Sequence, residues 1–258
     1  ALPEQVVDDV ISSGFQSAGQ RCSALRVLFV QEEIADKVIS MLKGALQELS
    51  VGDPAQLATD VGPVIDQKAL DALNAHVEYL KDKAILHYQC RLPEMGDTGH
   101  FFFAPRLYEL SDLSILKDEV FGPCVHVIRF KGTELDRVID QVNATGFGLT
   151  MGIHSRIESR AQYLAKASRA GNIYINRNMI GAVVGVQPFG GRGLSGTGPK
   201  AGGPGYLKRL VKEKASPENA QTTNQLSDDV DFKITSEVQA EVDDVMANSI
   251  RDEKKWRN

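Results

Sequence analysis

The chain has 258 residues, of which 42% are hydrophobic and 24% charged, and its formal net charge is −5. This length accommodates one large α/β domain or two small ones, and the composition is that of an ordinary soluble globular protein. The acidic balance and the lack of a basic cluster argue against nucleic-acid binding, and no apolar run approaches the length that spans a membrane.

Amphipathic segments alternate with short apolar runs along most of the chain. Apolar residues at helical spacing predict helices over residues 3–15, 32–49, 68–83, 133–144 and 157–167. Short apolar runs predict strands over residues 24–30, 84–88, 125–130, 149–154 and 172–176. Residues 101–110 are extended but interrupted by Pro105, which suits an edge strand or a connection. Because alternating strands and helices require crossover connections, the sequence predicts an α/β fold with a parallel sheet and helices on both faces.

The connecting segments carry turn residues, and the C-terminal fifth of the chain differs from the rest. Loops are expected over residues 50–66, 92–100 and 111–123, and residues 181–205 form a glycine-rich loop. The stretch 206–213 suits either a strand or a helix. Beyond it, residues 216–231 are polar, which suits a linker or an extended arm. A capping box at Ser236 opens a helix over 236–256, whose thin apolar stripe suits loose attachment or an oligomer contact.

Three cysteines, Cys22, Cys90 and Cys124, are odd in number and form no closely spaced ligand pair. This usage argues against both a disulfide framework and a zinc site, so no metal is expected. The first residues carry acids and lack the basic region of a signal peptide. We therefore expect reduced thiols and a cytoplasmic location.

Cys22 is the strongest candidate for a reactive group, because it follows a tight turn at Gly19 and the polar residues Gln20 and Arg21. A thiolate is a strong nucleophile whose reactivity depends on nearby dipoles and positive charge. Most free cysteines are small buried hydrophobes, so the residue alone does not decide between these two interpretations. Cys124 directly follows a Gly-Pro pair and is expected to be buried and inert.

Two later segments are weak signals when each is taken singly. The stretch Glu119-Val120-Phe121-Gly122-Pro123 places a carboxylate and an aromatic ring in a loop before a predicted strand. The glycine-rich stretch 190–196 does not follow a strand and open a helix, which argues against a dinucleotide phosphate loop and favours a tight chain path. Its Ser195 has no histidine–acid partner and is expected to make turn hydrogen bonds.

Taken together and in order, these segments resemble the aldehyde dehydrogenase superfamily. The pieces are F-x-x-x-G-Q-x-C ending at Cys22, E-V-F-G-P from Glu119, P-F-G-G from Pro188 and G-x-S-G from Gly193. A closer resemblance is to the glutamate-semialdehyde (1-pyrroline-5-carboxylate) dehydrogenases, and most of all to those that form the C-terminal module of bifunctional proline utilisation A proteins. The stretch over residues 174–191, continued by G-P-K-A-G-G-P at 198–204, carries this closer match.

The resemblance implies an NAD-dependent oxidation of a semialdehyde to glutamate in proline catabolism. Cys22 would attack the aldehyde carbon to give a thiohemiacetal and then a thioester, which water hydrolyses. Glu119 matches the family acid that binds the nicotinamide ribose, and Phe121 matches a ring beside the nicotinamide. For the substrate carboxylate, the resemblance implies backbone donors at Gly181 and Ala182 and the hydroxyl of Ser23. Phe189 matches an aromatic residue in the wall of the aldehyde pocket. A phenylalanine of the hydrophobic core is an equally good interpretation of this residue.

The resemblance also places parts of the family enzyme before Cys22. It implies that residues 1–213 form the catalytic domain, with residues 214–258 unassigned. In the family, the general-base glutamate, the oxyanion asparagine and most of the NAD-binding domain precede the nucleophile, so we expect the isolated chain to be inactive. Expected partners are those upstream NAD-binding and proline dehydrogenase (FAD) domains, and further copies in a homo-oligomer. Two alternatives stay open: a non-catalytic folding or oligomerisation module, and a relative linked to coenzyme A or acyl phosphate.

Overall fold

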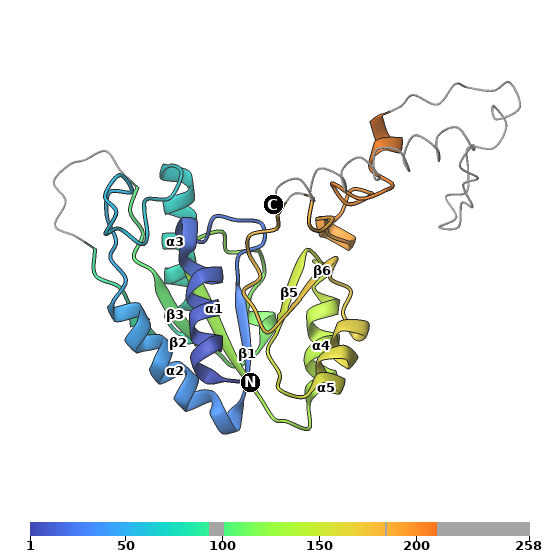
Figure 1. The fold of residues 1–258 in the computed structure, drawn as a ribbon. Coiled ribbons are helices and arrows are strands. Elements are labelled where there is room, and N and C mark those ends of the chain that lie inside the picture. Colours follow the sequence, from blue (N-terminus) through green and yellow to red (C-terminus); the bar gives the residue numbers. More distant parts are fainter. Residues whose placement is uncertain (93–100, 184, 211–258) are drawn as a thin grey trace, which may run out of the picture. The chain divides into compact units, whose positions relative to one another are not determined.

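Four strands form the larger sheet of the chain (Figure 1). Their order is β1 (Val27–Gln31), β4 (Cys124–Phe130), β3 (Arg106–Leu110) and β2 (Ala84–Gln89). β4 runs parallel to both β1 and β3, as the crossover argument predicts, whereas β2 is antiparallel to β3. The computed structural model describes residues 1–92, 101–183 and 185–210.

The position of β3 corrects one prediction. The interruption at Pro105 suggested an edge strand or a connection, but β3 lies inside the sheet between β4 and β2. Pro105 directly precedes the strand, so its missing N–H removes no hydrogen bond from the ladder. Its carbonyl instead accepts a hydrogen bond from the N–H of Cys90 at 2.9 Å, just after β2.

Helices cover both faces of this sheet, as predicted. Because side chains alternate along a strand, β4 contributes Val125 and Val127 to one face and Cys124 and Ile128 to the other. The first pair packs in a core with the buried faces of α1 (Pro3–Phe15) and α2 (Glu32–Gln47). The second pair packs with Leu80 of α3 (Gln67–Leu80).

A smaller sheet contains two parallel strands, β5 (Thr150–Ile153) and β6 (Asn172–Ile175). Its helices are α4 (Leu135–Ala144) and α5 (Glu158–Ala167). The core of this unit consists of the buried residues Ile139, Ile153, Ala161 and Leu164, against which the partly buried Ile173 of β6 packs. Polar contacts tie this unit to α1. His154 Nε2 lies 2.8 Å from a carboxylate oxygen of Asp9, and the Gln5 amide donates to the carbonyl of Asn176 at 2.6 Å.

The predicted helices and strands are confirmed with shifts of a few residues at their ends. Residues 207–210 form a short 3-10 helix, so the helical alternative holds for the described part of 206–213. The turn-rich loop after residue 92, the polar linker, the C-terminal helix and the boundary at 213 lie outside the described residues. Among the helices of the described ranges, none is long and apolar enough to cross a membrane.

Candidate active site

The cysteine loop begins with a left-handed turn at the end of α1. Ser17, Ala18 and Gly19 have φ of 56°, 52° and 62°, a conformation that costs non-glycine residues roughly 1–2 kcal/mol each. Local hydrogen bonds hold it: the N–H of Gln20 donates to the carbonyl of Ser17 at 3.0 Å. This turn places Cys22 on the surface, where its side chain is exposed.

The turn packs directly on the loop that carries Glu119. A Cβ atom built on Gly19 would lie 2.2 Å from the carbonyl oxygen of Gly122, which no side chain tolerates. Glycine is therefore required at position 19 by this close approach, and its positive φ also favours glycine. The contact brings together two motifs that are about a hundred residues apart in the sequence.

Arg26 joins the same two loops through its side chain. Its guanidinium donates to the carbonyls of Gly19 at 2.6 Å and Arg21 at 3.0 Å, and to Oε1 of Glu119 at 3.1 Å. The guanidinium carbon also lies 4.6 Å from the centre of the Phe121 ring, within cation–π range. Burial lowers the pKa of Arg26 and the neighbouring Glu119 carboxylate opposes that shift. Arg26 thus orients both predicted cofactor residues.

Arg26 was missed in the sequence analysis. An arginine inside a predicted apolar strand segment is a signal, because a buried guanidinium needs anionic or carbonyl partners. The sequence does not indicate which partners those are. Glu119 keeps 41% of its side chain exposed and Phe121 keeps 45% of its surface exposed, so both remain open to a ligand.

The Gly181 loop is attached to the cysteine loop through Ser13 of α1. The buried Ser13 hydroxyl accepts from the N–H of Met179 at 3.1 Å, and its carbonyl accepts from the N–H of Leu25 at 2.9 Å. Gly181 is exposed with φ of 74°, and Ala182 is half-buried. These bonds bring the predicted carboxylate-binding segment and the segment after Cys22 to one end of α1.

Two other predicted substrate residues are less accessible or lie elsewhere. Ser23 is buried, with 7% of its surface exposed. Phe189 is half-buried and pairs with Ala201 through two hydrogen bonds of 3.0 and 2.9 Å within the glycine-rich segment. Among the described residues, Phe189 is not part of the hydrogen-bond network around Arg26. The Ser195 hydroxyl accepts a hydrogen bond from the N–H of Gly148 at 3.1 Å, a contact between distant segments, while its backbone N–H makes a turn bond to the carbonyl of Arg192.

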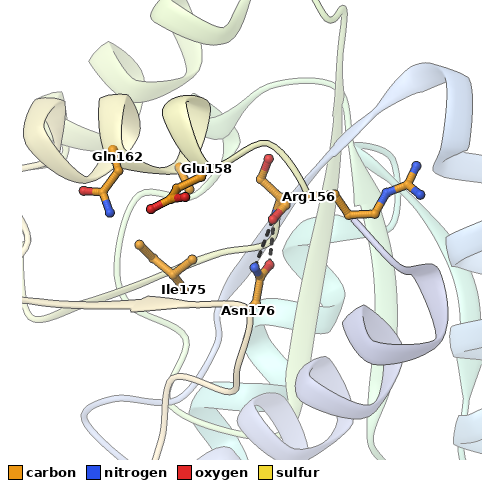
Figure 2. A pocket seen from close by; sticks show the side chains of 7 residues that line it. Arg156, Glu158, Gln162, Ile175 and Asn176 are labelled. Atoms are coloured by element: carbon orange, nitrogen blue, oxygen red, sulfur yellow. Dashed lines mark hydrogen bonds between the residues drawn. The ribbon is translucent and has the colours of Figure 1, made fainter.

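A pocket of about 340 Å³ lies at the ends of β5 and β6 and beside α5 (Figure 2). Its walls include Arg156, Glu158, Gln162 and Ile175, while Asn176 is held by two hydrogen bonds of 2.9 Å to the backbone of Ser155. None of the predicted site residues lines it, and its lining carries no thiol. The pocket is therefore distinct from the candidate active site.

The three thiols are expected to differ in reactivity. Cys90 and Cys124 are buried, and burial raises their pKa to about 11 and about 12, whereas Cys22 is exposed. Because the thiolate is the reactive form, a disulfide reagent such as Ellman's should modify one thiol rapidly in the native chain and three after denaturation. Cys22→Ser should remove the rapid phase. Rapid modification of Cys90 or Cys124 in the native chain would contradict the described burial.

A family model described as "Aldehyde dehydrogenase family" matches residues 2–216, which is most of the chain. The chain belongs to the aldehyde dehydrogenase family. Its relatives in this family include the bifunctional protein PutA of Klebsiella aerogenes, 50% identical over 224 residues, covering 85% of this chain and 17% of that protein. The 1-pyrroline-5-carboxylate dehydrogenase of Geobacillus kaustophilus is 36% identical over 217 residues, covering 83% of this chain and 41% of that protein.

A solved structure supports the aldehyde dehydrogenase fold. A mutant of proline utilization A from Bradyrhizobium japonicum superposes with a TM-score of 0.79 at 55% identity, covering 83% of this chain and 22% of that chain. The chain thus spans about a fifth of the PutA proteins that it resembles. The fold, a sheet with parallel strands and helices on both faces, agrees with this proline utilization A structure.

Proposed function

We propose that this chain carries the nucleophile and part of the cofactor site of an NAD-dependent L-glutamate γ-semialdehyde (1-pyrroline-5-carboxylate) dehydrogenase in proline catabolism. One observation carries the proposal: the Cys22 loop packs on the Glu119 loop. Gly19 contacts Gly122, and the Arg26 side chain forms hydrogen bonds with both loops. Similarity to PutA and to 1-pyrroline-5-carboxylate dehydrogenases supports the choice of substrate.

Cys22 is the proposed nucleophile. Its thiolate adds to the aldehyde carbon, and the resulting thiohemiacetal oxygen carries negative charge that fixed N–H donors stabilise. The N–H of Cys22 itself makes no hydrogen bond with the residues that the structure describes, so it is available as such a donor. Loss of hydride converts the thiohemiacetal to a thioester, and water releases the carboxylic acid and the free thiol.

Glu119 and Phe121 fit a nicotinamide nucleotide. Both contacts of Arg26 with Glu119 use Oε1, so the carboxylate is oriented while much of its surface stays exposed. A carboxylate accepts hydrogen bonds from neighbouring ribose hydroxyls, and an exposed aromatic ring offers a flat surface beside a planar ring. NAD, when bound, supplies the hydride acceptor. Arg26 holds the two side chains that would contact it.

For the substrate, we propose that the N–H groups of Gly181 and Ala182 bind the α-carboxylate, with help from the Ser23 hydroxyl. The exposed backbone of Gly181 allows close approach of an anion, and Ser13 holds this loop beside the segment that follows Cys22. Phe189 is the proposed aromatic wall of the aldehyde pocket. These assignments rest on the family resemblance as well as on the placement of the loops.

The wider setting is proposed from the relatives. The PutA relatives are named bifunctional and are several times longer than this chain, which supports a polypeptide with further domains. We propose that these are NAD-binding and proline dehydrogenase (FAD) domains and that the polypeptide is active as a homo-oligomer. The three cysteines are free thiols, in keeping with the proposed cytoplasmic location. The general base and the side-chain oxyanion donor are assigned to no residue of this chain.

Glu119→Gln should reduce kcat/KM for NAD by about 10- to 100-fold, because hydrogen bonds to a charged group contribute roughly 1.5–3 kcal/mol. The measurement is semialdehyde-dependent NADH formation by the polypeptide encoded in the complete reading frame. Asp118→Asn is the matched control, since Asp118 is exposed on the same loop one residue earlier, and it should leave kcat/KM unchanged. Equal effects of the two variants would contradict the proposed cofactor contact.

The reaction product separates the proposed function from its alternatives. Free glutamate is expected as the product, with no requirement for coenzyme A or inorganic phosphate. Formation of an acyl-CoA or acyl phosphate would assign the chain to a linked relative instead. Absence of any turnover by the complete polypeptide would favour the non-catalytic module.

A further inference from the structure

A second cluster of reactive side chains lies on the face of the larger sheet that α3 covers. Cys124 and His126 occupy alternate positions on β4 and so point to the same face. His76 comes from α3 above them. The Nε2 atoms of His76 and His126 are 2.9 Å apart, and Sγ of Cys124 lies 3.7 Å from Nε2 of His126. All three ligand atoms lie within 4.8 Å of one another.

The hydrogen bonds of His126 direct one lone pair into this cluster. Its Nδ1 lies 2.9 Å from the carbonyl oxygen of Arg26, which only accepts, so Nδ1 carries the proton. Nε2 of His126 is then unprotonated and faces both His76 and Cys124. A histidine whose second nitrogen donates to a backbone carbonyl is the usual arrangement of a metal-bound imidazole.

Two of the three separations between the ligand atoms are close to those around a coordinated ion. Metal–nitrogen bonds of about 2.0–2.1 Å and metal–sulfur bonds of about 2.3 Å at tetrahedral angles separate two nitrogens by about 3.3 Å, and nitrogen from sulfur by about 3.6 Å. The sulfur–nitrogen separation of 3.7 Å already fits. The two nitrogens, at 2.9 Å, need to separate by a few tenths of an ångström. The third pair, Sγ of Cys124 and the His76 nitrogen, lies within 4.8 Å and must come to about 3.6 Å. Both adjustments fall to the half-buried side chain of His76.

Burial raises the pKa of the Cys124 thiol to about 12, so this group is a neutral thiol in the metal-free chain. The positive charges of Arg106 and Arg26 oppose that shift and would favour the thiolate that a bound cation requires. Arg106 is the β3 residue in register with Cys124, and its Nη1 is buried without a hydrogen-bond partner among the described residues. The positive charges of these two guanidinium groups repel a metal cation unless the negative charge of the thiolate offsets its charge.

We propose that His76, Cys124 and His126 form a binding site for one thiophilic cation, Zn²⁺ or Cu⁺. Soft thiolate and imidazole ligands select these ions over Mg²⁺ or Ca²⁺. On binding, the Cys124 thiol releases its proton to solvent, and the His76 proton moves from Nε2 to Nδ1. The site is next to the Glu119 loop in the fold. Cys124 directly follows that loop, and Nδ1 of His126 donates a hydrogen bond to the carbonyl of Arg26.

Cd²⁺ is the probe, since its bond to a thiolate gives an ultraviolet charge-transfer band. We expect the reduced full chain to bind one equivalent with this band. Cys124→Ser should abolish the band, whereas Cys22→Ser, which removes the exposed thiol, should leave it intact. His76→Gln changes a half-buried helix residue and should weaken binding on the order of a hundredfold. Far-UV circular dichroism establishes that each variant is folded, and His76→Gln decides if Cys124→Ser does not fold.

Competition identifies the ion. Displacement of Cd²⁺ by Zn²⁺ assigns a divalent site, and displacement by Cu⁺ alone assigns a monovalent one. Excess Mg²⁺ should leave the band unchanged. A chain that shows no band, a band lost in Cys22→Ser, or tight Cd²⁺ binding that survives in His76→Gln would overturn the proposal. This assay requires no catalytic activity, so its outcome is independent of the proposed dehydrogenase function.

Discussion

Replacing Cys22 with alanine is expected to lower semialdehyde oxidation by the polypeptide of the complete reading frame by about 10⁴-fold or more, a loss typical of a removed nucleophile. The thiol forms the covalent bond to the substrate, and nothing else in the Arg26 network replaces it. Cys22 is exposed, so alanine leaves no cavity and the melting temperature should stay within about 1–2 °C of the parent. The measurements are kcat from NADH formation and thermal unfolding by circular dichroism.

Cys90→Ala is the matched control for this variant. Cys90 is buried, and its Sγ lies 3.2 Å from the carbonyl oxygen of Leu46, far in the sequence from the proposed site. Its replacement should cost some stability and leave kcat within a few-fold of the parent. Turnover that persists in Cys22→Ala would refute the nucleophile assignment. Equal inactivity of both variants would indicate a general loss of structure rather than of chemistry.

The bounds of the helices and strands are predicted closely by the local spacing of apolar residues, because each element buries apolar side chains at its own period. α1 begins at Pro3 and ends at Phe15 as the sequence predicts, and α2 follows the apolar spacing from Glu32. The error at β3 arose because Pro105 interrupts an extended stretch, and local sequence does not indicate that the ladder starts one residue later. The antiparallel pairing of β2 with β3 likewise depends on tertiary packing.

The candidate site was predictable only through the order of its motifs. Nothing local to Cys22 or Glu119 indicates that they share a neighbour, since the contact depends on how β1 and β4 pair in the sheet. Arg26 and Ser13 make the joining bonds, yet the sequence does not indicate the partner of either. A search for cysteine pairs also overlooks the Cys124 cluster, whose third member comes from α3.

Gly19→Ala should destabilise the chain by about 3 kcal/mol or more, although it adds a single methyl group. Ala18 adopts a φ of 52° in the same turn, so the backbone conformation alone does not forbid alanine. The decisive term is steric. The new Cβ would lie 2.2 Å from the carbonyl oxygen and 2.5 Å from the carbonyl carbon of Gly122, and these backbone atoms cannot rotate away as a side chain does. The loops that carry Cys22 and Glu119 must separate.

Gly44→Ala makes the same chemical change where there is room for it. Gly44 lies inside α2, and a Cβ there meets no atom within 4 Å. Alanine favours the helix by roughly 0.5–1 kcal/mol, so this variant should unfold at a higher denaturant concentration than the parent while Gly19→Ala unfolds at a lower one. Chemical denaturation of the parent, Gly19→Ala and Gly44→Ala measures whether each substitution lowers or raises the free energy of unfolding. Equal midpoints for Gly19→Ala and the parent would show that the two loops are not in contact, and the arrangement proposed for the active site would fail with them.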